Sequence, residues 1–338
     1  MAFYLGSIKL GNSVNKVDNK LVAILNDTIE SLNAVDFGEI SVVPEHMLHG
    51  STSLKSVELP DTVETIKYSA FENCKNLSSI NFPQGLKIIE RYAFHQNESL
   101  KNVQLPEGLE SIGDAAFGDC TMLESLNIPT TVTYLGTISG CTNLKSKITI
   151  PTAMTEIPSY MFLDCNSLTD IEILGDVTFF DYGTFFNCSS LKNVTVPKNL
   201  ATMDDSVFNG CSSLEEIVLP NTLTTMGKNC FMDCSSLTKC ELSSSLAEIP
   251  NNCFENCTSL PSITLPASIT KINNRAFYGC SSLKEMIILA TTPPTLPSSM
   301  ALSGIELETI KVPKGTLEIY TQNASWSKYS SIIIEMEG

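Results

Sequence analysis

A phenylalanine recurs every 23 residues along most of this chain of 338 residues. Phe71, Phe94 and Phe117 form one series with this spacing. A second series comprises Phe162, Phe185, Phe208, Phe231, Phe254 and Phe277. A cysteine follows most of these phenylalanines after three residues, and a leucine follows the cysteine after three more. A fixed period of this length predicts a stack of supersecondary units rather than a globule around one central core.

Each repeat is predicted to form one coil that contains at least one short strand. In the repeat that begins at Cys188, apolar residues alternate with polar ones up to Val196, which is typical of a strand. Pro197 then ends the strand, because proline lacks a backbone donor. Asn, Asp or Gly precedes most of the periodic cysteines and favours a tight turn there. We therefore expect a repeat solenoid of about ten 23-residue coils whose strands pair in register.

The repeat also divides the chain into three parts. Residues 42–290 carry the regular period and are predicted to form the solenoid. Residues 1–41 are predicted to be an N-terminal cap or attachment segment, and residues 291–338 a C-terminal capping repeat and tail. One coil is irregular, because Cys141 follows the preceding cysteine of its phase by two residues fewer than the period, and Ile138 stands near the missing phenylalanine. An altered loop or local kink is expected there, not a domain break.

Charge and hydropathy exclude two classes of partner. The chain carries 21 basic and 37 acidic residues, a formal net charge of −16. Such a surface repels phosphate backbones, so no nucleic acid partner is predicted. No stretch approaches the ~20 apolar residues of a membrane helix, so no membrane insertion is predicted either. The N-terminus lacks the basic and apolar regions of a secretory signal peptide.

The twelve cysteines are predicted to be buried free thiols. Nine of them fall at one phase of the repeat. Cys230 and Cys253 stand where other repeats carry alanine, and Cys240 stands where others carry isoleucine. Cysteine that exchanges with small or apolar residues behaves as a packed hydrophobe. One thiol per coil forms a column, whereas a zinc site needs ligands that converge, so disulfides and thiolate metal sites are not expected.

No constellation of residues indicates catalysis, so no catalytic residue and no enzymatic activity are predicted. The chain contains no nucleophile elbow, P-loop or dinucleotide-binding motif. His46 and His49, with Glu45, suggest a metal site, but a third convergent ligand is missing from the motif. We therefore expect no metal site and no cofactor. His95 lies in a variable loop phase beside Phe94 and is expected to be exposed.

One residue of each strand is predicted to point outward, because it lies between two inward apolar positions. The predicted ligand-binding column consists of Glu58, Asn81, Gln104, Asn127, Thr149, Glu172, Thr195, Glu241 and Thr264. It is polar or acidic through most of the stack and becomes mixed at Val218 and Ile287. A binding face and a merely solvated sheet face both fit this pattern. If the column binds a ligand, the middle rungs are expected to contribute most.

These repeats resemble the BspA-like leucine-rich repeat family, of the gut bacterial or prophage-associated type. The segment from Cys257 to Phe277 matches the family unit C-x-x-L-x-x-I-x-[LI]-P-x-x-[LV]-x-x-I-G-x-x-A-F almost letter for letter. The tail is similar to the family's usual ending, with the T-P-P-T turn at 292–295 followed by Tyr320, Trp326 and Tyr329. The segment 21–37 resembles the leader of such proteins in gut bacteria and their prophages.

The resemblance implies a right-handed curved solenoid with a β-lined concave face that carries the outward column. It also implies a non-catalytic adhesion module that recognises a protein or glycan on a host or neighbouring cell surface. The alternative is an accessory structural protein of a phage or prophage particle, docked through the N-terminal segment. A surface-exposed location, on a cell or a virion, is favoured, although no signal peptide is predicted.

Overall fold

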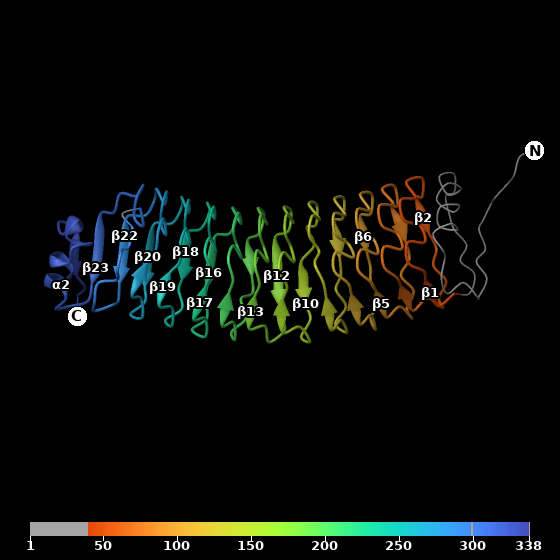
Figure 1. Cartoon of the computed structure of the whole chain (residues 1–338), viewed down its shortest axis with the longest axis horizontal. Helices are drawn as coiled ribbons and strands as arrows, with labels where there is room; N and C mark the ends of the chain where they lie inside the picture. The colour runs from red at the N-terminus through yellow and green to blue at the C-terminus, as the bar shows by residue number, and fades with distance from the viewer. Residues whose placement is uncertain (1–39, 299, 338) are drawn as a thin grey trace, which may run out of the picture. The chain divides into compact units, whose positions relative to one another are not determined.

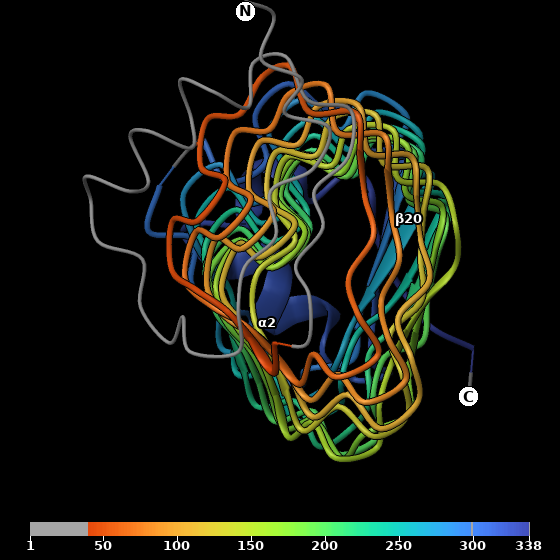
Figure 2. The ribbon, with the colours of Figure 1, turned by 90° about the vertical axis from the view of Figure 1, so that its right-hand side faces the viewer.

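The computed structural model describes residues 40–298 and 300–337, which form two compact units. The first unit comprises residues 40–154 and 161–175, and the second comprises 155–160 and the residues from 176 onward. Each unit is a parallel β-solenoid in which short strands alternate with tight turns (Figure 1). Successive coils within a unit lie over one another, so that equivalent strands stack (Figure 2).

The strands of the first unit pair only with equivalent strands of neighbouring coils. One five-stranded sheet contains β1 (Val42–Val43), β3 (Thr65–Ile66), β5 (Ile88–Ile89), β7 (Ser111–Ile112) and β9 (Tyr134–Leu135). On the other side of each coil, β2 (Ser56–Val57) pairs with β4 (Ser79–Ile80), β6 (Asn102–Val103) with β8 (Ser125–Leu126), and β10 (Ile148–Ile150) with β12 (Asp170–Ile173). Partners such as Val42 and Thr65 are one repeat apart, which confirms the predicted in-register pairing.

The second unit repeats this arrangement. One four-stranded sheet contains β11 (Glu156–Ile157), β13 (Phe179–Phe180), β15 (Thr202–Met203) and β17 (Thr225–Met226), and β19 (Glu248–Ile249) pairs with β21 (Lys271–Ile272). The other ladder contains β14 (Asn193–Val194), the pair β16 (Glu216–Val218) and β18 (Lys239–Glu241), and the sheet β20 (Ser262–Leu265), β22 (Glu285–Ile288), β23 (Thr309–Val312) and β24 (Ile333–Glu335). Because β23 and β24 lie beyond residue 290, the ladder extends into the predicted C-terminal cap.

Two of the tail residues that the family resemblance singled out, Tyr320 and Trp326, are buried and tie the C-terminus to the solenoid. The tail contains α2 (Leu317–Gln322) and the 3-10 helix η1 (Ser327–Tyr329). The Tyr320 hydroxyl donates to the Ala290 carbonyl at 2.7 Å, and the Trp326 indole donates to the Pro294 carbonyl at 2.7 Å. Their rings meet edge to face, with centroids 5.9 Å apart. The Tyr320 hydroxyl and the Trp326 indole N–H are thus hydrogen-bonded, while both rings are removed from water.

The periodic phenylalanines form the core. In the first unit, the Phe94 ring stacks between Phe71 and Phe117, with centroids 5.1 and 5.3 Å apart and planes within 6°. In the second unit, the same stacking runs through Phe185, Phe208, Phe231, Phe254 and Phe277. All of these side chains are fully buried. Rings placed one strand spacing apart, about 4.8 Å, stack in the offset parallel geometry that aromatic pairs favour.

The twelve cysteines are all free and buried, as predicted. Most of the nine thiols that share one phase of the repeat donate a hydrogen bond to a backbone carbonyl in an adjacent coil. The Cys211 thiol, for example, lies 3.2 Å from the carbonyl oxygen of Phe185. Burial raises the pKa of the Cys74 thiol and of the Cys230 thiol to about 12. These groups therefore remain neutral and unreactive in the folded protein, because the thiolate is the nucleophilic form.

The irregular coil keeps its core although it lacks a phenylalanine. Ile138 is buried at the expected position, and its carbonyl accepts a hydrogen bond from the Cys165 thiol at 3.2 Å, as the phenylalanine carbonyls do elsewhere. The Ile138 amide donates to the Met161 carbonyl at 2.7 Å. A buried apolar side chain therefore occupies this core position in the irregular coil as well.

Asn97 is the exception in the cysteine column, at a position equivalent to Cys74 and Cys120. Its side chain is fully buried, and within the described residues neither amide atom has a hydrogen-bond partner. Because buried polar groups without partners are costly, we expect Asn97→Cys to raise the free energy of unfolding by about 1–3 kcal/mol. Urea denaturation followed by circular dichroism measures this difference.

Asn127→Cys is the matched control, because the Asn127 amide makes two hydrogen bonds to the Leu105 backbone, at 2.6 and 2.9 Å. The same chemical change there should lower the free energy of unfolding by about 1 kcal/mol. Destabilisation by both substitutions would contradict the assignment of Asn97 as an unsatisfied group.

Candidate functional site

The predicted ligand-binding column lies on the β2-to-β12 ladder in the first unit. Glu58, Asn81 and Gln104 are exposed there. Asn127, Thr149 and Glu172 are half-buried. The flanking strand residues, such as Val57 and Leu59, are buried. The outward orientation of the column follows from this alternation, whereas its role in binding stays a prediction.

Two asparagines of the column bind the backbone of a neighbouring coil. The Asn81 amide accepts from Leu59 N at 2.6 Å and donates to Leu59 O at 2.8 Å. Asn127 makes the same pair of bonds to Leu105. These amides extend the ladder where the regular strand pairing stops. Asn127 was predicted to be a central binding residue, but its polar atoms already bond the backbone of a neighbouring coil.

Glu172 is held by neighbours on its own face of the first unit. Its carboxylate lies 2.9 Å from Lys147 Nζ and 3.3 Å from the Thr149 hydroxyl. Hydrogen bonding and charge from Lys147 hold the pKa of Glu172 below its usual range. Lys147 is the extra residue of the irregular coil. This rung is therefore ionic but locally neutralised.

In the second unit, the column residues Thr195, Glu241 and Thr264 are all exposed. Lys239 and Glu241 lie on the same face of β18, two residues apart, and their charged atoms are 2.6 Å apart. The carboxylate of Glu241 raises the pKa of Lys239 by accepting its hydrogen bond. Val218, which pairs in register with Glu241, exposes 54% of its surface. Charged and apolar groups thus alternate along this face.

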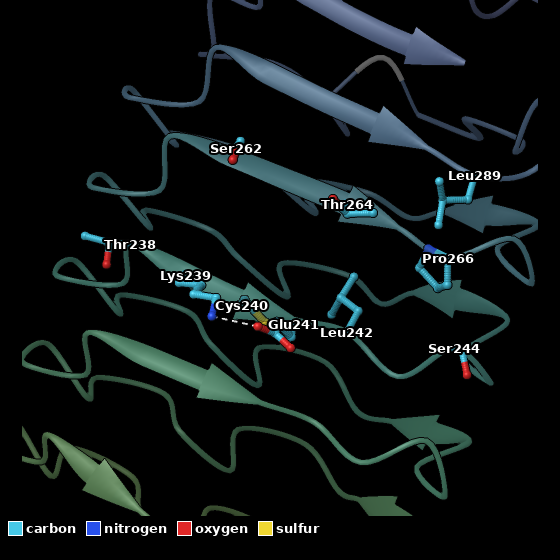
Figure 3. A pocket seen from close by; sticks show the side chains of 10 residues that line it. All are labelled: Thr238, Lys239, Cys240, Glu241, Leu242, Ser244, Ser262, Thr264, Pro266 and Leu289. Atoms are coloured by element: carbon cyan, nitrogen blue, oxygen red, sulfur yellow. Dashed lines mark ion pairs between the residues drawn. The ribbon is translucent and has the colours of Figure 1, made fainter. Parts of the chain in front are cut away.

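A pocket of about 380 Å³ opens on the strand face of the second unit (Figure 3). Its lining residues are Thr238, Lys239, Cys240, Glu241, Leu242, Ser244, Ser262, Thr264, Pro266 and Leu289. Leu242, Pro266 and Leu289 form an apolar wall, whereas the Lys239–Glu241 ion pair, Ser262 and Thr264 supply polar groups. Two predicted column residues, Glu241 and Thr264, therefore line a concavity. Among its lining residues, Leu289 replaces the proline that most other repeats carry at this phase.

Two further hollows lie on the neighbouring strands of the same unit. One, of about 450 Å³, is lined by Val194, Val196, Lys198, Glu216, Ile217, Val218 and Pro220. The other, of about 370 Å³, is lined by Lys192, Asn193, Glu215 and Glu216. Because β16 pairs in register with β18, these hollows and the pocket follow successive rungs of one face.

A carboxylate lies close to the two histidines for which no third convergent group was predicted. Atoms of His46, His49 and Glu72 all lie within 4.8 Å of one another. The expectation that no third group converges is therefore wrong, and the nearby carboxylate is Glu72 rather than Glu45. Glu72 follows His49 by one repeat, so the period alone predicts that Glu72 lies next to His49 in the adjacent coil. The expectation that His95 is exposed is also wrong, since only 20% of its side chain is exposed.

Comparison with protein families identifies the repeat. A model for the BspA type leucine-rich repeat region matches residues 23–145, 136–238 and 202–332, in six copies. The chain belongs to the BspA-type leucine-rich repeat family. The match spans nearly all of this BspA-type protein and includes the coils of both units.

Solved structures agree with this assignment at the level of the fold. A leucine-rich repeat protein from Bacteroides ovatus is 24% identical, with a TM-score of 0.60, over 90% of this chain and 92% of that one. A leucine-rich cell surface protein from Faecalibacterium prausnitzii is 24% identical, with a TM-score of 0.56, over 98% and 92%. The pneumococcal vaccine antigen PcpA is 18% identical, with a TM-score of 0.54, over 98% and 94%. Similarity at these identities establishes the parallel solenoid and not the ligand.

Two other findings describe the BspA-type protein. No curated protein matches its sequence. Across the part of the chain that the structure describes, no helix combines the length and the apolar character needed to cross a membrane.

Proposed function

We propose that this BspA-type protein is a non-catalytic binding module that recognises a protein on a host or neighbouring cell surface through the strand face of its second unit. The observation that carries the proposal is the pocket on β18 and β20, where the predicted column meets an apolar wall. Binding energy usually concentrates where a side chain of the partner enters such a pocket. The cell surface location draws support from the similar Faecalibacterium prausnitzii protein.

The chemistry of the pocket favours a protein over a glycan. Among the described residues, no aromatic ring lines it, so a sugar finds no flat surface to stack on there. Leu289 exposes 40% of its surface and offers apolar contact to an aliphatic or aromatic side chain, and Val218, in a neighbouring hollow of the same face, exposes 54%. The net charge of −16 favours a partner with basic groups around its apolar anchor.

The phage or prophage alternative depends on the N-terminal segment. That segment, residues 1–41, lies almost wholly outside the described residues. The proposal therefore rests on the strand face of the second unit, where the pocket and its lining residues are described. The N-terminal alternative becomes an outcome of the experiment.

The test begins with a search for ligands, in which the purified chain is screened against a peptide display library and a glycan array. For a ligand found in this way, Leu289→Asp should weaken binding by about 2 kcal/mol or more, because it places a charge in the apolar wall. Glu241→Lys should also weaken the binding of a basic ligand, because it reverses the charge at the pocket rim. Surface plasmon resonance measures both changes.

Ile319→Asp is the matched control, because Ile319 is 53% exposed on α2 of the same unit and lies outside the pocket. It should leave affinity unchanged. Binding that survives Leu289→Asp and Glu241→Lys but is lost on deletion of residues 1–39 would refute the strand face as the site. That result would assign docking to the N-terminal segment. Selective binding on the glycan array would show that the ligand is a glycan rather than a protein.

A further inference from the structure

All three histidines of the chain gather around one carboxylate, Glu72 in the first unit. The Nδ1 atom of His49 is 3.3 Å from Glu72 Oε2, and the Nδ1 atom of His95 is 3.5 Å from Glu72 Oε1. The rings of His46 and His49 lie 5.7 Å apart, edge to face. The chain contains only three histidines, so this gathering leaves none elsewhere.

The repeat explains why these residues meet. His49, Glu72 and His95 each follow the core residue of their coil, so they share one phase and stack at about one strand spacing, 4.8 Å. His46 joins them through a tight turn, in which the His49 amide donates to the His46 carbonyl at 3.2 Å. The left-handed backbone of His46, with a φ of 55°, and its bond to the Tyr68 carbonyl at 3.0 Å fix this turn.

We propose that His46, His49 and Glu72 form a binding site for a divalent transition-metal ion of the Zn²⁺ type. Their ligand atoms all lie within 4.8 Å of one another, close enough for small side-chain rotations to surround one ion. Two imidazoles and one carboxylate are ligands that Zn²⁺ accepts, with water in the fourth position of a tetrahedron. Imidazole nitrogen selects transition metals over Ca²⁺ and Mg²⁺, which prefer oxygen.

A second observation points to a cation at this place. The Nδ1 atom of His49 is buried, and among the described residues it has no hydrogen-bond partner, although Glu72 Oε2 is 3.3 Å away. An imidazole lone pair that faces a carboxylate is unfavourable, and either a proton on Nδ1 or a metal ion bound between the two groups removes the repulsion. A metal ion bound by His49 and Glu72 removes this repulsion and satisfies the buried nitrogen.

His95 lies on the other side of Glu72, and Asp119 lies beside His95. The Nε2 atom of His95 lies 3.2 Å from Asp119 Oδ2, while its Nδ1 atom faces Glu72. Like His49 Nδ1, His95 Nδ1 has no hydrogen-bond partner among the described residues, and His95 lies outside the cluster of three candidate ligands. Because the three ligands come from two successive coils, a bound ion joins these coils and stabilises the folded chain.

The experiment uses isothermal titration calorimetry of the full chain, without a histidine tag, with Zn²⁺ as the probe at neutral pH. We expect one saturable site per chain. Substitutions His46→Ala, His49→Ala and Glu72→Gln should each weaken Zn²⁺ binding at least about 10-fold, since even outer partners of metal ligands contribute that much. Glu45→Gln is the matched control and should leave the dissociation constant unchanged, because Glu45 adjoins His46 in sequence without joining the cluster.

Thermal unfolding provides a second readout that is independent of calorimetry. Zn²⁺ should raise the unfolding temperature of the unmodified chain and of Glu45→Gln but not that of His49→Ala, and all three should unfold alike without metal. Absence of saturable binding overturns the proposal. So does an equal loss of affinity in Glu45→Gln and Glu72→Gln, or equal competition by Ca²⁺, because either result indicates general attraction to an acidic surface. The site does not depend on the proposed function, so each can fail without the other.

Discussion

Raising the pH from neutrality to about 10 should unfold this protein cooperatively, because its buried thiols resist ionisation while unfolded thiols do not. An unfolded cysteine has a pKa near 8.5. Burial raises the pKa of Cys74, Cys141 and Cys230 to about 12, and it raises the pKa of Cys120 and Cys253 in the same direction. The folded chain therefore holds protons that the unfolded chain releases.

The sign of the effect follows from this difference in bound protons. The stability that neutral thiols contribute is fully present below about pH 8.5 and is lost as the pH rises toward 12. Each pH unit in this window costs about 1.4 kcal/mol for every thiol that stays protonated only in the folded state. With several such thiols, the loss approaches the whole 5–15 kcal/mol typical of a folded domain by about pH 10.

Circular dichroism across a pH series, with a thiol reagent added in parallel, measures this transition. Labelling should be slow at neutral pH and should rise together with the loss of structure. Cys230→Ala with Cys253→Ala is the informative variant, because alanine occupies this phase in other coils, at Ala70 and Ala93 for example. The variant has two fewer buried thiols and should unfold at higher pH. Rapid labelling of most thiols in the native protein at neutral pH would contradict the account.

The fold could be predicted from the sequence because each phase of the repeat meets the same phase of the next coil. The period alone therefore places Phe94 on Phe71, and pairs Val42 with Thr65, with no knowledge of the chain's path. The burial of Cys240 could also be predicted, since apolar residues occupy its phase elsewhere. These predictions use only the identity of residues within one column.

The sites were harder to predict, because they combine different phases or depend on how side chains pair across coils. His46 and Glu72 belong to different phases, so their meeting depends on the conformation of a turn. Asn127 was predicted to contact a ligand, but its hydrogen bonds to Leu105 depend on where regular strand pairing stops. The pocket beside Leu289 combines Glu241 and Thr264 of the column with Leu242, Pro266 and Leu289 of other phases, so no single column of the repeat predicts it.

Phe208→Ala should lower the free energy of unfolding by roughly 3–5 kcal/mol, the cost of removing a large buried aromatic side chain. Phe208 is fully buried in the second unit. Its ring stacks on Phe185 at 5.1 Å and on Phe231 at 5.5 Å, and it meets the edge of Phe180 at 6.3 Å. Substitution therefore removes the contacts of three rings as well as the burial of one.

The cavity should persist, because the strand ladders on both sides hold neighbouring coils at a fixed spacing and prevent collapse. Urea unfolding measures the loss as a lower midpoint with an unchanged slope. Val218→Ala is the control in the same unit, since this exposed side chain should change stability by no more than about 0.5 kcal/mol. A loss below about 1 kcal/mol for Phe208→Ala would show that the coil relaxes around the gap, and that the phenylalanine column is not the element that holds successive coils together.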